Sequence, residues 1–171
     1  MPIQKLILLI INIGGGGAVL GSYIIGLAGK TNGSAALWGG TPANVKPFYS
    51  ASMLLAALSY FVFLYFIFFK LSPEVVNFNI LYLIFIGILL PSILWMPLTN
   101  LYVTAPGAGV WLGIRLVLIL VGLFSIALTW FLMRLGGSGT AYGLAVGGSV
   151  YLAFHTLVLD AILWPVFFKL T

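Results

Sequence analysis

The chain has no cysteine and very few charged side chains. Without cysteine there is no disulfide, no thiolate nucleophile and no metal site built on sulfur. Charged residues make up only 5% of the 171 residues, whereas a soluble domain carries about 25%. These charges are too few to cover a core that faces water, so we expect lipid to solvate most of the protein surface.

Hydrophobic residues make up 63% of the chain and occur in long runs. A membrane-spanning helix needs about 20 predominantly apolar residues. We predict an all-α membrane protein, a five-helix transmembrane bundle that forms one domain over residues 1–171. The N-terminal run starts like a signal peptide but exceeds the usual hydrophobic length, so we interpret it as the first membrane helix. The predicted helices cover residues 6–29, 48–70, 78–103, 110–134 and 142–169, with a long loop at 30–47.

The arrangement of the few charges argues against nucleic-acid binding. The net charge is +5, but lysines and arginines occur singly and form no basic run. They are typical of anchors at the membrane surface, and their even distribution leaves the orientation and the identity of the membrane open. Glu74 follows Ser72 and Pro73, a pattern that predicts a helix cap at the surface rather than a catalytic acid.

Two features in the first third of the chain have two interpretations each. The first predicted helix contains four consecutive glycines, Gly14 to Gly17. We interpret them as a surface for close helix packing, and the alternative is an unwound segment that lines a ligand site. Trp38 lies in the centre of the long loop. It is either an anchor at the membrane interface or a lid residue over a cavity.

The last predicted helix carries Asp160, one of two acidic residues, and the single histidine, His155. A carboxylate in hydrocarbon is unfavourable and needs a partner or a cavity. At the rise of an α-helix, Arg115 lies about 7–8 Å and Asp160 about 12 Å inside the same membrane face. We therefore predict a buried Arg115–Asp160 ion pair between the last two helices.

His155 is five positions from Asp160, so the two side chains point to different faces of an α-helix. We predict that His155 is a buried imidazole bonded to a neighbouring hydroxyl. With one histidine and no cysteine, neither a metal site nor a haem site is expected.

Polar and aromatic side chains from several predicted helices end near the membrane face that holds Arg115. We predict that they line one pocket, open toward the long loop and covered by Trp38, to which the start of the second helix contributes Tyr49. Alternatively, Arg115 and Asp160 only lock two helices together, or they form part of a proton or ion pathway. No catalytic residue and no cofactor is assigned. The residues predicted to bind a ligand are Trp38, Trp95, Asn100, Arg115, Thr156, Asp160 and Trp164.

The third predicted helix contains Leu94, Trp95, Met96 and Pro97. With five predicted crossings and a long, tryptophan-containing first loop, this Leu-Trp-x-Pro pattern resembles the translocator protein family, also called tryptophan-rich sensory proteins. The asparagine that precedes Leu-Trp in that family is Ser92 here. The resemblance implies a five-helix membrane protein with a pocket under the first loop. It also implies a sterol-, porphyrin- or pigment-like apolar ligand.

These observations favour a non-enzymatic protein that binds an apolar or amphipathic small molecule between the second to fifth helices. The first alternative is an accessory or scaffold subunit of a larger membrane complex, or a homo-oligomer, because almost no chain lies outside the predicted membrane spans. The second alternative is a lipid-modifying membrane enzyme or an oligomeric channel. An enzyme needs paired acid and base groups within hydrogen-bond reach, and the estimated depths separate His155, Asp160 and Glu74.

Overall fold

The protein is described by a computed structural model that covers residues 1–28 and 35–168. These residues form five long helical spans and no β-strand. Each span is long and apolar enough to cross a membrane, which confirms the predicted all-α, five-helix, multi-pass integral membrane protein. The first four spans are α1 (Ile3–Leu27), α3 (Lys46–Phe69), α4 (Phe78–Thr104) and α5 (Ala108–Arg134). The fifth span consists of α6 (Thr140–Ala153), the π-helix η1 (Phe154–Leu163) and α7 (Trp164–Phe167).

The loop between the first two spans contains a short helix, α2 (Ala35–Trp38), where the sequence predicts only a loop. Residues 29–34 and 169–171 lie outside the described residues. They include the last residue of the first predicted helix, the start of the predicted loop and the last residue of the fifth predicted helix. Gly39 follows α2 with a φ of +49°, and a Cβ there would lie 3.0 Å from the Cα of Phe168. The N–H of Gly40 donates to the carbonyl of Phe167 at 2.9 Å. The loop is therefore fastened to the end of the fifth span.

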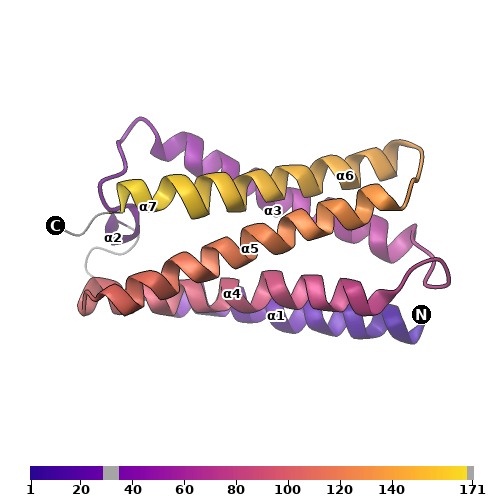
Figure 1. The fold of residues 1–171 in the computed structure, drawn as a ribbon, viewed down its shortest axis with the longest axis horizontal. Helices are drawn as coiled ribbons and strands as arrows, with labels where there is room; N and C mark the ends of the chain where they lie inside the picture. The colour runs from indigo at the N-terminus through magenta and orange to yellow at the C-terminus, as the bar shows by residue number, and fades with distance from the viewer. Residues whose placement is uncertain (29–34, 169–171) are drawn as a thin grey trace.

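The spans pack as two pairs with α5 crossing between them (Figure 1). One pair is α1 with α4, and the other is α3 with α6. α5 packs against α4 on one side and against α6 and η1 on the other, and it joins the two pairs. α1 is the most exposed span, with 11% of its most apolar window buried, against 33–44% for the other four. It therefore lies at the edge of the bundle.

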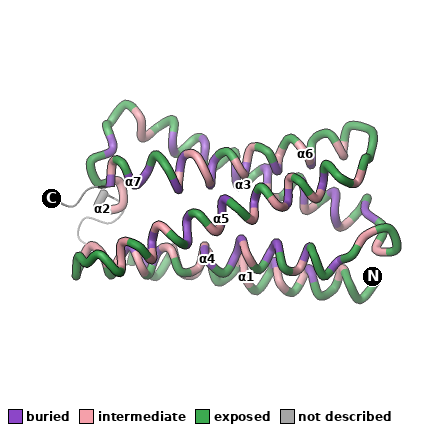
Figure 2. Tube along the Cα trace, viewed as in Figure 1, coloured by how far each residue is buried: buried purple, intermediate pink, exposed green. Residues whose placement is uncertain are grey.

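Buried apolar residues form two clusters. Figure 2 shows buried and exposed positions alternating along each helix, as expected for helices that pack on one side. In the larger cluster Phe63 and Phe85 pack with ring centroids 6.3 Å apart, and Leu128 joins them from α5. The smaller cluster surrounds Ile114 and Trp164 near α2 and α7. Large apolar side chains remain exposed on the outer faces, as lipid contact requires. Examples are Ile24, Ile25, Phe61 and Leu83.

The connection between α3 and α4 differs from the predicted helix cap at Ser72. α4 begins at Phe78, and the side chain of Asn77 caps it by accepting from the N–H of Asn79 at 3.0 Å. Ser72 instead accepts from the N–H of Glu74 at 3.5 Å within a turn. The predicted cap is wrong because asparagine directly before the helix satisfies the first free N–H groups equally well. Glu74 is exposed, as expected.

Candidate functional site

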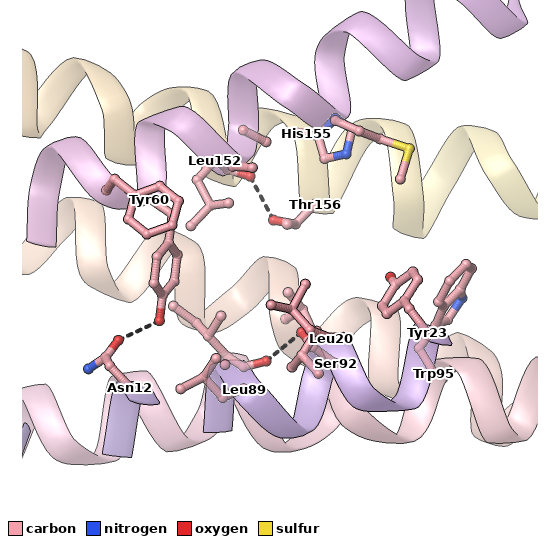
Figure 3. A pocket seen from close by; sticks show the side chains of 18 of the residues that line it. Asn12, Leu20, Tyr23, Tyr60, Leu89, Ser92, Trp95, Leu152, His155 and Thr156 are labelled. Carbon is pink, nitrogen blue, oxygen red and sulfur yellow. Dashed lines mark hydrogen bonds between the residues drawn. The ribbon is translucent and has the colours of Figure 1, made fainter. Parts of the chain in front are cut away.

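A cavity of about 960 Å³ lies between the α1–α4 pair and the α3–α6 pair (Figure 3). α1 packs along α4 and meets α3 through a few contacts near its own start. There the Lys5 ammonium donates to the carbonyl of Phe68 at 2.7 Å, and the Tyr60 hydroxyl donates to the side-chain oxygen of Asn12 at 2.6 Å. Beyond these bonds the space between α1 and α3 is lined by side chains of both helices, of α4 and of the fifth span.

Most polar side chains on the cavity wall already have partners. Asn12 is bonded to Tyr60, as Figure 3 shows. The hydroxyl of Ser92 donates to the carbonyl of Ile88 at 2.7 Å. The hydroxyl of Thr156 donates to the carbonyl of Leu152 at 2.8 Å. Because these polar groups are hydrogen-bonded within the protein, the cavity wall is effectively apolar along most of its length.

One part of the cavity is different, and we call it the Asp160 end. It lies beside α2 and α7, and its side chains come from α1, α2, α3, α4 and the fifth span. The side chain of Asp160 is 29% exposed. Asp160 is one of the residues that line the cavity. The lining side chains of the Asp160 end are Tyr23, Trp38, Tyr49, Trp95, His155, Asp160 and Trp164.

The π-helix η1 brings His155 and Asp160 together. Their Nε2 and Oδ2 atoms lie 3.6 Å apart. In a π-helix the backbone bonds run from residue i to residue i+5, so side chains five positions apart share one face. The expectation that these two residues point to different faces is therefore wrong, because it assumed α-helical spacing. π-helical segments are rare in proteins, and those that do occur are often found at functional sites.

A hydrogen-bond network joins this face of η1 to α3. The hydroxyl of Tyr49 donates to Oδ1 of Asp160 at 2.9 Å. The Oγ of Ser52 shares hydrogen bonds of 2.9 Å with Nδ1 of His155 and with the hydroxyl of Tyr151. The predicted bond between His155 and a neighbouring hydroxyl is thus confirmed. The network holds both ionisable side chains in place at the cavity wall.

The predicted Arg115–Asp160 ion pair is not formed. Among residues 1–28 and 35–168, the nitrogen-bearing side chain beside the Asp160 carboxylate is the imidazole of His155, with Nε2 3.6 Å from Oδ2. Arg115 is half-exposed on α5 and does not line the cavity. The depth estimate gave the height of each residue along its helix. The direction of the side chain depends on the rotation of the helix, and the π-helical turn directs Asp160 toward α3.

Of the other predicted ligand-binding residues, all but Asn100 line the cavity. Trp38, Trp95, Thr156 and Trp164 line the cavity together with Asp160. Asn100 is not among the lining residues, and its amide donates to the carbonyl of Gly26 at 3.1 Å, which joins α4 to α1. Tyr23 and His155 line the Asp160 end and are absent from the sequence-based set. Their signals were weak: one tyrosine in an apolar helix, and a spacing of five that has meaning only in a π-helix.

Aromatic rings surround the Asp160 end and hold α2 over it. Tyr23 and Trp95 have ring centroids 5.4 Å apart (Figure 3), and Trp95 meets Trp164 at 5.7 Å. Trp38 packs edge-on against Tyr49 at 5.8 Å. The indole N–H of Trp164 donates to the carbonyl of Leu37 at 3.0 Å, which fixes α2 against the fifth span. Trp38 therefore has the position that the lid interpretation requires.

The indole N–H of Trp95 is buried and has no hydrogen-bond partner among the described residues. A buried donor without an acceptor destabilises a protein by about 1–3 kcal/mol. Buried donors in native structures usually have an acceptor, so this N–H is available to an acceptor on a bound molecule. The unpaired donor lies in the ring cluster of the Asp160 end, where the polar groups of the cavity are concentrated.

Ser52, His155 and Asp160 are the residue types of a hydrolase triad, but the nucleophile is out of reach here. Ser52 is 3% exposed and does not line the cavity. A catalytic serine must reach the substrate carbonyl, and it needs N–H donors for the oxyanion. Within the described residues, no group of three His, Cys, Asp or Glu side chains is placed to hold a metal. The arrangement is suited to holding a polar group.

Comparison of the chain with protein-family models, with curated proteins and with solved structures finds no match. The resemblance to the translocator protein family therefore stays a prediction from the sequence.

Proposed function

We propose that this membrane protein is a non-enzymatic binder of an amphipathic small molecule, held in the cavity between α1 and α3. The observation that carries the proposal is the cavity itself, about 960 Å³ with largely apolar walls and one polar end. Ligand pockets for small organic molecules range from about 300 to 1,000 Å³ and combine apolar walls with a few convergent polar groups. A sterol- or porphyrin-sized molecule, as the family resemblance implies, has the right dimensions.

The ligand enters from the bilayer in this proposal. The cavity lining includes Leu20 of α1 and Phe61 of α3, each 67% exposed on the lipid-facing surface. The cavity is therefore continuous with the lipid between these two helices. An apolar molecule dissolved in the membrane reaches it without crossing water, which suits a ligand with a long hydrocarbon part.

A pair of glycine variants tests this function. Gly16 lines the cavity, and a Cβ built there meets no atom within 4 Å. Gly14 has equally open space but does not line the cavity. The Gly16→Phe side chain therefore occupies the cavity, whereas the Gly14→Phe side chain faces lipid and serves as the matched control.

The measurement is thermal unfolding in nonionic micelles with a sterol, a porphyrin and a series of single-chain amphiphiles. We expect at least one probe to raise the midpoint of wild type and of the Gly14→Phe variant by several degrees, as mass action on a folded-state site requires. The Gly16→Phe variant loses this response. Equal stabilisation of all three proteins, or no response of wild type to any probe, contradicts the proposed function.

A further inference from the structure

The Asp160 end of the cavity combines one carboxylate with several aromatic rings. Tyr23, Trp38, Tyr49, Trp95 and Trp164 all line it. They form two connected groups, with Trp95 between Tyr23 and Trp164, and with Tyr49 between Trp38 and the Oδ1 atom of Asp160. The carboxylate therefore contacts Tyr49 directly, and the other four rings line the same end of the cavity. We call these five rings the aromatic cage.

The charge of this carboxylate lacks a strong counter-ion within the described part of the chain. Its partners there are the Tyr49 hydroxyl at 2.9 Å and the His155 imidazole at 3.6 Å. Among the described residues that line the cavity, none is lysine or arginine. A carboxylate offers about four acceptor positions, and these two contacts leave acceptor capacity on the side that faces the cavity.

The chemistry of such a site favours a cation. A carboxylate in surroundings of low dielectric constant gains most from a nearby positive charge. Aromatic faces carry negative potential and attract cations, and aromatic cages are a common means of recognising alkylammonium groups. An anionic head group meets like charge at Asp160. A neutral head group uses the acceptor positions but leaves the negative potential of the rings unused.

We propose that the ligand is a cationic amphiphile, with an amine or quaternary ammonium head at Asp160 and a hydrocarbon tail along the apolar cavity. This inference rests on the proposed function and specifies the chemical class of its ligand. The ammonium belongs either to a free single-chain amine or to the choline head group of a lipid. In both cases the tail lies toward the opening between α1 and α3 and joins the surrounding hydrocarbon.

The test is a titration of the protein in nonionic maltoside micelles with four probes that share a twelve-carbon tail. They are N,N-dimethyldodecylamine, dodecanol, dodecanoate and dodecylphosphocholine. Binding is followed by intrinsic tryptophan fluorescence, because Trp38, Trp95 and Trp164 line the site. For wild type at neutral pH we expect the amine to bind about 10- to 100-fold more tightly than dodecanol, as a hydrogen bond to a charged group provides. Dodecanoate binds most weakly.

Two variants test which side chains cause the preference for the amine over dodecanol. Asp160→Asn keeps the size of the side chain and an acceptor for Tyr49, and we expect it to reduce the preference for the amine to about twofold or less. Trp38→Leu removes one ring of the cage and weakens binding of the amine by about 3- to 30-fold, with little change for dodecanol. Trp130→Leu is the control, since Trp130 is 58% exposed on α5 and does not line the cavity. If Asp160→Asn does not fold, Trp38→Leu and its control still decide the question.

The outcomes separate this inference from the proposed function. Amine binding without phosphocholine binding identifies a free amine as the ligand type, and comparable binding of both identifies a choline lipid. The inference is overturned if dodecanol binds wild type as tightly as the amine, or if the variants at Asp160 and Trp38 keep the full preference. In that case the proposed function still stands if Gly16→Phe abolishes binding of both probes. If no probe binds wild type, both proposals fail.

Discussion

The two halves of the fifth span, α6 and η1, differ in helix type and in the contacts that their side chains make. α6 is a regular α-helix that packs close to α3, and a Cβ at Gly148 would lie 3.2 Å from the backbone oxygen of Ser59. η1 is π-helical and directs His155 and Asp160 into the same network. The first half provides close contact between helices, and the second half provides polar groups at a cavity. Close packing and the candidate site are thus separated along a single membrane span.

The largest effect is expected from filling the close contact in α6. Gly148→Leu places a side chain against the α3 backbone and separates the two helices, which destabilises the protein by about 1–3 kcal/mol. Thermal unfolding in micelles measures the change. Gly147→Leu is the matched control, because a Cβ at Gly147 meets nothing within 4 Å. If both variants unfold at the same temperature as wild type, the result contradicts close packing of α6 against α3.

The next effect is expected where η1 is joined to α3. Ser52→Ala removes the hydroxyl that both His155 and Tyr151 contact. The loss leaves buried polar atoms without this partner and lowers the free energy of unfolding by about 2 kcal/mol. Ser50→Ala, at an exposed position of the same helix, should leave it unchanged. Equal unfolding midpoints for the two alanine variants would show that the network does not hold η1 in place.

A smaller effect is expected at the edge of the same network. Tyr49→Phe keeps the ring of the Asp160 end and removes the hydrogen bond to Asp160. We expect a loss of about 1 kcal/mol in stability, with binding of the amine probe changed less than by Asp160→Asn. Tyr65→Phe is the control for stability alone, because Tyr65 is exposed on α3 but also lines the cavity. A stability loss in the control as large as that in Tyr49→Phe argues against a specific role of the bond.

The smallest effect is expected at Arg115, where the sequence-based ion pair and the observed network disagree. Because Arg115 is half-exposed and Asp160 is bonded elsewhere, Arg115→Gln should change stability by no more than about 0.5 kcal/mol. A double-mutant cycle with Asp160→Asn measures the coupling of the two residues directly. An interaction energy above about 1 kcal/mol indicates contact between them and restores the predicted ion pair.

Much of the fold was accessible from the sequence because lipid imposes a simple rule. Each span must bury its backbone bonds within a helix of sufficient apolar length, and all five spans were recognisable on that basis. The cap of α4 was not recognisable, because several residues before α4 are suitable caps and only the folded chain selects Asn77. The short helix α2 depends on contacts with the end of the fifth span, which no local pattern encodes.

The candidate site was accessible only in part. Asp160 stood out because an acidic residue in an apolar run requires an explanation, and the tryptophans stood out as interfacial residues. Tyr23 carried no such signal, since a tyrosine in a membrane helix is common. The cavity arises because α1 follows α4 and leaves α3 beyond Asn12. The relative direction of two packed helices is set by their whole interface and not by any short segment.

The sequence by itself determined that the protein lies in a membrane, crosses it five times and carries one carboxylate within its last span. Composition and run length are sufficient for these conclusions, because the transfer of side chains and backbone into lipid is governed by local chemistry. Only the tertiary structure decided which way that carboxylate points. A π-helical segment with the same residues turns Asp160 toward Tyr49 and His155, whereas an α-helical one separates His155 from it. η1 packs against α3 and α5, so the partners of this carboxylate are set by contacts between helices and not by its own segment.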